Sequence, residues 1–184
     1  KLLKFNIPCQ IKNKQNIFDS EASSLLVFFI DSLLNPRLYR NISLLATSKF
    51  VEIDVEDLVN QKISKKLDNL TNQCIKWSHE LKEKGFLVLV NELIISYSSS
   101  SISCDADLYS NLFQLSEILE IELINNDFNL KKVYKWYQNQ LDNSSRICTG
   151  EDFLTKDYNL QNGINISTIH SSKGLEFDLV LCPY

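Results

Sequence analysis

Methionine is absent from this sequence of 184 residues, which also contains only four glycines, three prolines and two histidines. Its cysteines are odd in number, lie far apart, and form no C-x-x-C pair. This pattern argues against a disulfide framework, and the shortage of histidine argues against a structural zinc site. We therefore expect reduced thiols in a cytoplasmic protein that binds no structural metal. The cysteines are Cys9, Cys74, Cys104, Cys148 and Cys182.

Long apolar runs and a strong positive charge are also missing. No segment approaches the roughly 18 apolar residues that a membrane span requires, and the N-terminus lacks the charged-then-apolar pattern of a signal peptide. We therefore expect no membrane partner. The formal net charge is −4 and the pI is about 5.2. A chain with this charge does not bind nucleic acid through bulk electrostatics, so any contact with DNA must be local.

The phosphate-binding P-loop is the last notable absence. The pattern G-x-x-x-x-G-K-[ST] occurs nowhere in the chain, so we expect the chain to have no site of its own for gripping ATP. It begins at Lys1 without an initiator methionine and stops at Tyr184 within an expected strand. We interpret it as a piece of a larger protein.

Hydrophobic periodicity predicts helices through the middle of the chain. Asp19 is expected to cap the first helix, which stops at Asn35-Pro36, and a longer third helix is expected to end near Gly85. Their expected apolar faces are Leu25, Leu26, Phe29, Ile30, Leu33 and Leu34 in the first helix, Leu38, Ile42 and Leu45 in the second, and Leu67, Leu70, Cys74, Trp77 and Leu81 in the third.

Three further helices are expected after Gly85. The first carries Phe86, Leu89, Val90, Leu93, Ile94 and Tyr97, and the serine run 98–101 is expected to break it as a flexible connector. Asp105 caps the next helix, which has Leu108, Leu112, Leu115 and Leu119 in line, and Asn129 opens the last, which carries Val133, Trp136, Tyr137 and Gln140. Trp136 and Tyr137 could stack on bases, but aromatic residues at helical spacing indicate packing in the core.

Two groups of like charges lie on these helices. Lys131, Lys132 and Lys135 are expected to form a solvated face. Glu117, Glu120 and Glu122 would be repelled by phosphate, so we expect them to face water or a protein partner.

The segment from Thr168 to Phe177, T-I-H-S-S-K-G-L-E-F, is the stretch that indicates a chemistry. It lies between the alternating segment 164–168 and the apolar run 179–182, which predicts a loop joining two buried parallel strands. Open α/β sheets bind their ligands at such loops.

The residue types in this loop suit phosphates and sugars. Gly174 allows the backbone to approach a phosphate closely, and Lys173 adds a mobile cation. Thr168 and His170 offer short donors for a DNA phosphate or sugar, and such contacts position a strand without reading its sequence. Glu176 is an acceptor suited to a ribose hydroxyl.

This loop resembles motif V of the superfamily 1 DNA helicases of the UvrD, Rep and RecB group, whose usual form is T-x-H-x-[AS]-K-G-L-E-[FYW]. The resemblance implies that Thr168, His170 and Lys173 lie toward single-stranded DNA. It also implies that Gly174 and Glu176 lie toward ATP, and that ATP and Mg²⁺ are cofactors of the full-length parent.

Other segments are similar to the same family in its order along the chain. Residues 2–9 look like its L-x-x-x-G-I-P element, with Asn6 in the place of glycine. Residues 21–36 look like its E-x-x-x-[LI]-L…NP helix, and residues 43–48 contain the L-A-T-S form of the RecB branch. Residues 112–119 resemble the RecB-like helix L-x-H-[IL]-x-E-L-L. Gln114 there replaces the histidine, and Asp105, Ala106 and Asp107 replace the preceding arginines, which puts in doubt any DNA or partner contact made by those residues.

The resemblance implies a mainly α fold, in which a helical 2B-type insertion domain is flanked by β-strand pieces of a RecA-like α/β domain. We expect residues 1–18 to start the RecA-like domain 2A piece, 19–145 to form the helical 2B-like domain, and 146–184 to return to domain 2A with motif V. The parent would be a RecB-like exodeoxyribonuclease V β subunit, an ATP-dependent helicase and exonuclease. Its partners would be DNA ends and RecC-like γ and RecD-like α subunits. This chain alone, without Walker A, nuclease or catalytic residues, should be inactive.

Three alternatives remain open. A UvrD or Rep type helicase without a nuclease is the nearest, although L-A-T-S and the absence of a G-I-G turn disfavour it. An AddA-type subunit is the next. From another class, the helices could form a non-catalytic protein-binding scaffold whose motif V segment binds no nucleotide.

Overall fold

The computed structural model describes residues 9–11, 16–59, 64–97, 100–143, 153–155, 164–166 and 178–182. The chain divides into two compact units. One consists of residues 15–156 and contains the helices, and the other consists of residues 1–14 together with 157–184. The domain boundaries expected from the sequence stay a prediction.

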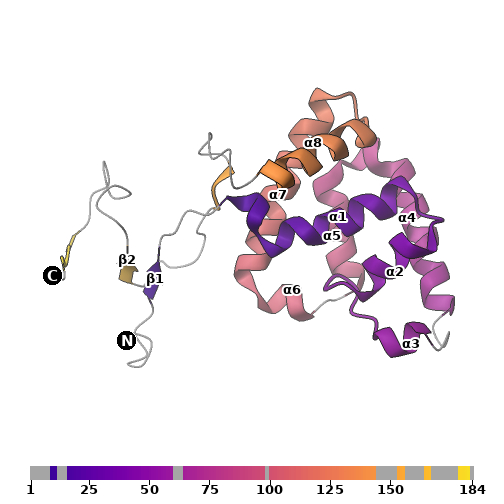
Figure 1. Cartoon of the computed structure of the whole chain (residues 1–184), viewed down its shortest axis with the longest axis horizontal. Coiled ribbons are helices and arrows are strands. Elements are labelled where there is room, and N and C mark those ends of the chain that lie inside the picture. Colours follow the sequence, from indigo (N-terminus) through magenta and orange to yellow (C-terminus); the bar gives the residue numbers. More distant parts are fainter. Residues whose placement is uncertain are drawn as a thin grey trace. The chain divides into compact units, whose positions relative to one another are not determined.

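The first unit is a bundle of helices, shown in Figure 1. Its elements are η2 (Ile17–Asp19), α1 (Glu21–Leu34), α2 (Tyr39–Thr47), α3 (Val55–Val59), α4 (Ser64–Lys84), α5 (Phe86–Tyr97), α6 (Ser100–Cys104), α7 (Ala106–Asn125) and α8 (Leu130–Asn143). The prediction of a mainly helical chain is therefore confirmed for the described residues. None of the described helices is long and apolar enough to cross a membrane.

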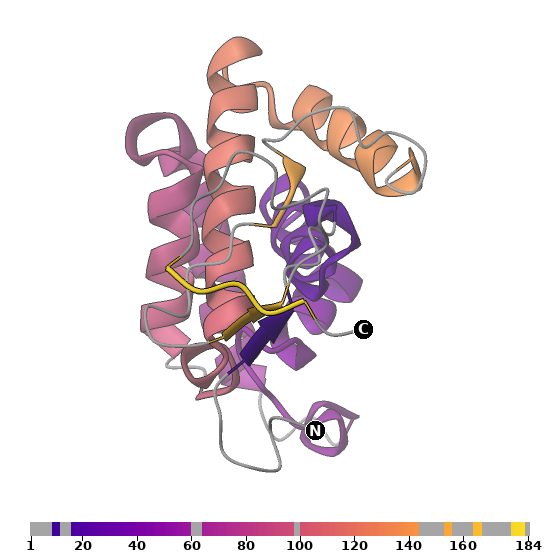
Figure 2. The same cartoon turned by 90° about the vertical axis from the view of Figure 1, so that its left-hand side faces the viewer.

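Helix α1 lies at the centre of this bundle and packs against α2, α4, α7 and α8. Its Phe29 is fully buried and is surrounded by the rings of Phe50, Trp77 and Phe86, at centroid distances of 6.3, 5.7 and 5.7 Å. Helix α7 runs alongside α5 and closes another side of the core, as Figure 2 shows. Burial of these aromatic and aliphatic side chains is the main source of stability in such a bundle.

The expected apolar faces agree closely with the buried residues. In α4, all of Leu67, Leu70, Cys74, Trp77 and Leu81 are buried. Burial raises the pKa of the Cys74 thiol to about 12, so this cysteine stays a neutral core residue at physiological pH. Tyr137 is also fully buried, and its hydroxyl donates to the Ser23 carbonyl at 3.0 Å. The expectation that Tyr137 is a core residue is confirmed.

Three expected helix boundaries are confirmed by their capping groups. Asp105 Oδ1 accepts from the Leu108 N–H at 2.9 Å at the start of α7. Asn129 Oδ1 accepts from the Lys132 N–H at 3.1 Å at the start of α8. Gly85 follows the end of α4 with a φ of +85°, a left-handed conformation that suits glycine.

Other expectations about the helices were wrong. Ser20, not Asp19, is the N-cap of α1, because residues 17–19 form a separate 3-10 turn that delays the helix by one residue. Leu38 is the extended N-cap of α2, so it lies off the helical face and is 52% exposed. The helix α5 does end at Tyr97, directly before the serine run, but Ser100 and Ser101 are not a flexible connector, because they belong to the short helix α6, in which Ile102 is completely buried.

The second unit contains a short parallel pair of strands, β1 (Cys9–Ile11) and β2 (Ile164–Ile166). Cys9 pairs with Ile164 and Ile11 with Ile166. The expected strand at 164–168 is thus present at its start. The RecA-like α/β domain that the resemblance implies stays a prediction.

The apolar run 179–182, expected to be a buried strand, is not one. These residues pair with no described strand, and Leu179, Val180 and Leu181 are 78%, 64% and 77% exposed. Cys182, expected to be strand core, is also exposed. A strand requires a neighbour for its backbone N–H and C=O groups, and the sequence of one segment does not reveal whether that neighbour is present.

Candidate functional site

The loop that the sequence predicts as the functional site lies outside the described residues. Thr168, His170, Lys173, Gly174 and Glu176 all fall between β2, which ends at Ile166, and Asp178. Their roles toward DNA and ATP therefore stay predictions. What the structure describes beside them is β2 and its parallel partner β1.

Among the residues that the structure describes, no group of three or more histidine, cysteine, aspartate or glutamate side chains could hold a metal ion.

The L-A-T-S sequence forms the last turn of α2 and its C-cap. Ser48 is the C-cap, and its hydroxyl donates to the Leu45 carbonyl at 2.7 Å and accepts from the Phe50 N–H at 3.3 Å. The Ala46 carbonyl accepts from the Ile53 N–H at 2.9 Å, which folds the following segment back onto the helix. The turn thereby inserts Phe50 into the core beside Phe29. The contacts described for this segment stabilise the fold.

The segment resembling the RecB helix 112–119 is also internal. Gln114, which occupies the histidine position, is 1% exposed, and its Nε2 donates to the Leu154 carbonyl at 2.8 Å. Leu154 forms an antiparallel bridge with Asn16, and the neighbouring Phe153 ring lies 5.6 Å from Phe18. The Gln114 hydrogen bond therefore holds the segment that follows α8 beside Asn16 and Phe18, at the start of the helical unit.

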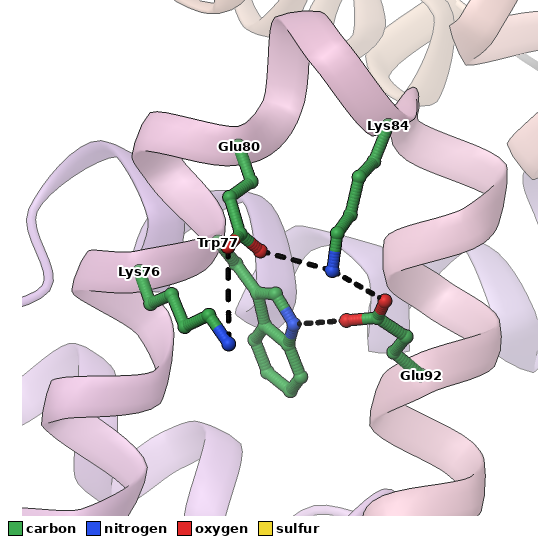
Figure 3. Close-up of polar contacts among 5 residues, drawn as sticks. All are labelled: Lys76, Trp77, Glu80, Lys84 and Glu92. Carbon is green, nitrogen blue, oxygen red and sulfur yellow. Dashed lines mark hydrogen bonds and ion pairs between the residues drawn. The ribbon is translucent and has the colours of Figure 1, made fainter.

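A polar network links the end of α4 to α5 above the core (Figure 3). The buried Trp77 indole donates to Glu92 Oε2 at 2.8 Å, and Glu92 Oε1 lies 2.6 Å from Lys84 Nζ. Lys84 also pairs with Glu80 at 3.0 Å. The network satisfies the one polar group of a fully buried tryptophan, which would otherwise be costly to bury. The sequence predicted the burial of Trp77 but not this partner, because the contact joins two helices.

The network predicts a pH dependence of stability. The pKa of the Glu92 carboxyl lies below its ordinary value, first because Lys84 donates to it and second because Trp77 does. A carboxyl with a lowered pKa in the folded chain contributes stability above its unfolded pKa, and this is lost as pH falls through the folded pKa. Glu92→Gln should therefore destabilise the chain more at about pH 7 than below about pH 4, as measured by urea unfolding. The contribution is small because the pair is exposed to solvent.

Glu83→Gln, on the exposed surface of α4, is the matched control for this variant. It removes the same charge and should show no comparable change between the two pH values. A Glu92→Gln effect that is identical at both pH values would contradict the assignment of the stabilisation to the ionised carboxylate.

Comparisons with known proteins agree with the resemblance that the motifs indicate. No protein-family model matches the chain. The chain is 26% identical over 197 residues to the RecBCD enzyme subunit RecB of Buchnera aphidicola subsp. Baizongia pistaciae, covering 100% of the chain and 16% of that protein. It is 28% identical to RecB of Chlamydia muridarum, covering 96% of the chain and 17% of that protein. RecB of Buchnera aphidicola subsp. Acyrthosiphon pisum is 27% identical, with coverages of 94% and 15%.

These matches confirm the resemblance that the motifs predict. The similarity is to RecB, a subunit of the RecBCD enzyme, and it extends over nearly the whole chain. The chain spans about one sixth of the length of the curated relatives that it matches. The activity, cofactors and partners of the full-length parent therefore stay predictions.

Proposed function

We propose that this chain is the helical 2B-type region and motif V of a RecB-like exodeoxyribonuclease V β subunit. The observation that supports the proposal most strongly is the similarity to RecB subunits over 94–100% of the chain. The helical bundle of residues 15–156 suits an insertion domain, because its ends are held together where Asn16 meets Leu154. A domain whose two ends adjoin can be inserted in another domain without disturbing it.

The parent protein would hydrolyse ATP, with Mg²⁺, to unwind DNA from an end and degrade it. Gly174 and Glu176 would contact the nucleotide, and Thr168, His170 and Lys173 would contact single-stranded DNA. One loop touching both ligands would couple ATP turnover to movement along the strand. The partners would be RecC-like γ and RecD-like α subunits, in the cytoplasm.

The test uses the full-length parent with its co-expressed partners and an end-labelled linear duplex, with and without ATP and magnesium. ATP-dependent degradation to short products is the expected result. Unwinding into intact single strands would favour a UvrD or Rep type helicase. No ATP-dependent change would contradict the proposal and favour a protein-binding scaffold.

Lys173→Ala and Glu176→Ala in the same complex should each lower DNA-stimulated ATP hydrolysis by about tenfold, which corresponds to about 1.4 kcal/mol in the barrier. Each change removes one charged contact of the loop with DNA or nucleotide. Steady-state ATPase rates at saturating DNA measure the effect. Lys156→Ala, which lies before β2 and outside the motif, is the control. Rates equal to those of the control would remove both residues from the proposed site.

A further inference from the structure

An open groove of about 550 Å³ lies between the turn that joins α1 to α2 and the middle of α4. Residues 34–38 line it on one side, and Ile75, Ser78 and His79 line it on the other. Its walls are held in place by the packing of both α1 and α2 against α4. The groove is therefore formed by packed parts of the helical bundle.

The charge of this groove is opposite to that of the chain. The chain carries a net charge of −4 and has three arginines, yet two of them, Arg37 and Arg40, lie only three positions apart, one in this turn and one directly after it. Arg37 lines the groove and Arg40 follows in the first turn of α2. Both are exposed, and neither forms an ion pair with a described residue. No aspartate or glutamate is among the lining residues.

Other side chains in and beside the groove add donors and an aromatic surface. Asn35 and His79 line the groove and can donate hydrogen bonds. Tyr39, between the two arginines, is 61% exposed, and Leu38 is 52% exposed. A tyrosine has an apolar ring and a polar hydroxyl, so the exposed Tyr39 suits a ligand that presents sugars beside charged groups.

We propose that this groove binds the sugar-phosphate backbone of duplex DNA. Arg37 and Arg40 pair with phosphate oxygens, since the planar guanidinium matches a phosphate with two hydrogen bonds. Asn35 and His79 donate to the same backbone, and Tyr39 packs on an adjacent sugar. Such contacts position DNA without reading its sequence. The proposal rests on the proposed function, which makes DNA the ligand of the parent.

The nature of the lining favours DNA over an acidic protein segment. The groove presents donors from four kinds of side chain, including the hydroxyl of Ser78. A protein partner would have to supply a carboxylate for each arginine. A DNA strand supplies a phosphate at every nucleotide. Arg37 and Arg40 can therefore find phosphates wherever the protein lies along the DNA.

The test is the salt dependence of DNA binding by the full-length protein with its partner subunits. Arg37→Gln/Arg40→Gln is compared with the wild type and with Lys131→Gln/Lys132→Gln, which removes the same charge from exposed positions of α8. Fluorescence anisotropy of a labelled duplex, without ATP, gives the slope of log K against log salt. The arginine variant should have a slope shallower by about 1.8, because each phosphate that an arginine neutralises adds about 0.9 to the slope, and the lysine variant should match the wild type.

Each other outcome overturns the proposal. Equal slopes for the arginine and lysine variants would show that the groove makes no phosphate contact. Unchanged DNA binding with loss of a partner subunit on gel filtration would assign the groove to a protein. If the wild-type complex unwinds DNA but the variants behave alike, only the groove assignment fails. If the wild-type complex neither binds nor unwinds DNA, the proposed function fails as well.

Discussion

Replacing Trp77 by alanine is expected to lower the free energy of unfolding of the chain by about 3–5 kcal/mol. Trp77 is fully buried in α4, and its ring packs edge-on against Phe29 at 5.7 Å. The substitution leaves a large cavity in the centre of the bundle and also removes the indole N–H that donates to Glu92, whose carboxylate keeps its ion pair with Lys84. Urea unfolding followed by far-UV circular dichroism measures the loss.

Trp136→Ala is the matched control for this prediction. Trp136 lies on α8, is half-buried, and meets Phe18 at the edge of the core with a centroid distance of 6.1 Å. Because water can fill part of the space left behind, its loss should be clearly smaller than that of Trp77. Equal losses for the two variants would contradict the central position assigned to Trp77.

Periodicity was sufficient to predict most of this core. The spacing of Leu67, Leu70, Cys74, Trp77 and Leu81 gives one apolar stripe on a helix, and all five side chains are buried. Local capping was also predictable where the cap bonds its own helix, as at Asp105 and Asn129. These features depend on residues within a few positions of one another.

Contacts between distant residues could not be predicted in this way. Glu120 was expected to face water or a partner, but its carboxylate accepts from the N–H groups of Phe86 and Leu87 at the start of α5. The bond to Leu87 joins residues 33 positions apart. No local pattern distinguishes Glu120 from Glu117 or Glu122, because the partner appears only when α7 packs beside α5.

The same contrast between local and distant residues applies to the two candidate sites. Motif V was predictable because its chemistry lies in one continuous loop, from Thr168 to Phe177. The groove at Arg37 was not predicted, because it forms between a turn and the middle of α4, some 40 residues later. The sequence did contain one signal, the two arginines on either side of Tyr39, but such a cluster gains meaning only when the structure shows all three exposed.

The contact of Glu120 with α5 explains a second large expected effect, that of Gly85→Ala. This substitution should lower the free energy of unfolding by about 2–3 kcal/mol, measured by urea unfolding. One part is the left-handed φ of +85°, which costs a residue with a Cβ about 1–2 kcal/mol. The other part is steric, because a Cβ at this position would lie 2.6 Å from Glu120 Oε1 and 2.9 Å from Oε2.

A double-mutant cycle separates the two parts. The Glu120 carboxylate can swing away from a new Cβ, but it then abandons the first N–H groups of α5, and losing such a cap costs about 1 kcal/mol. In a Glu120→Ala background that cap is already absent, so Gly85→Ala should cost only the backbone strain. Glu117→Ala, on the same helix, should leave the cost of Gly85→Ala unchanged. If the cost is the same in all three backgrounds, Glu120 does not hold the junction of α4 and α5, and strain at Gly85 alone accounts for the loss.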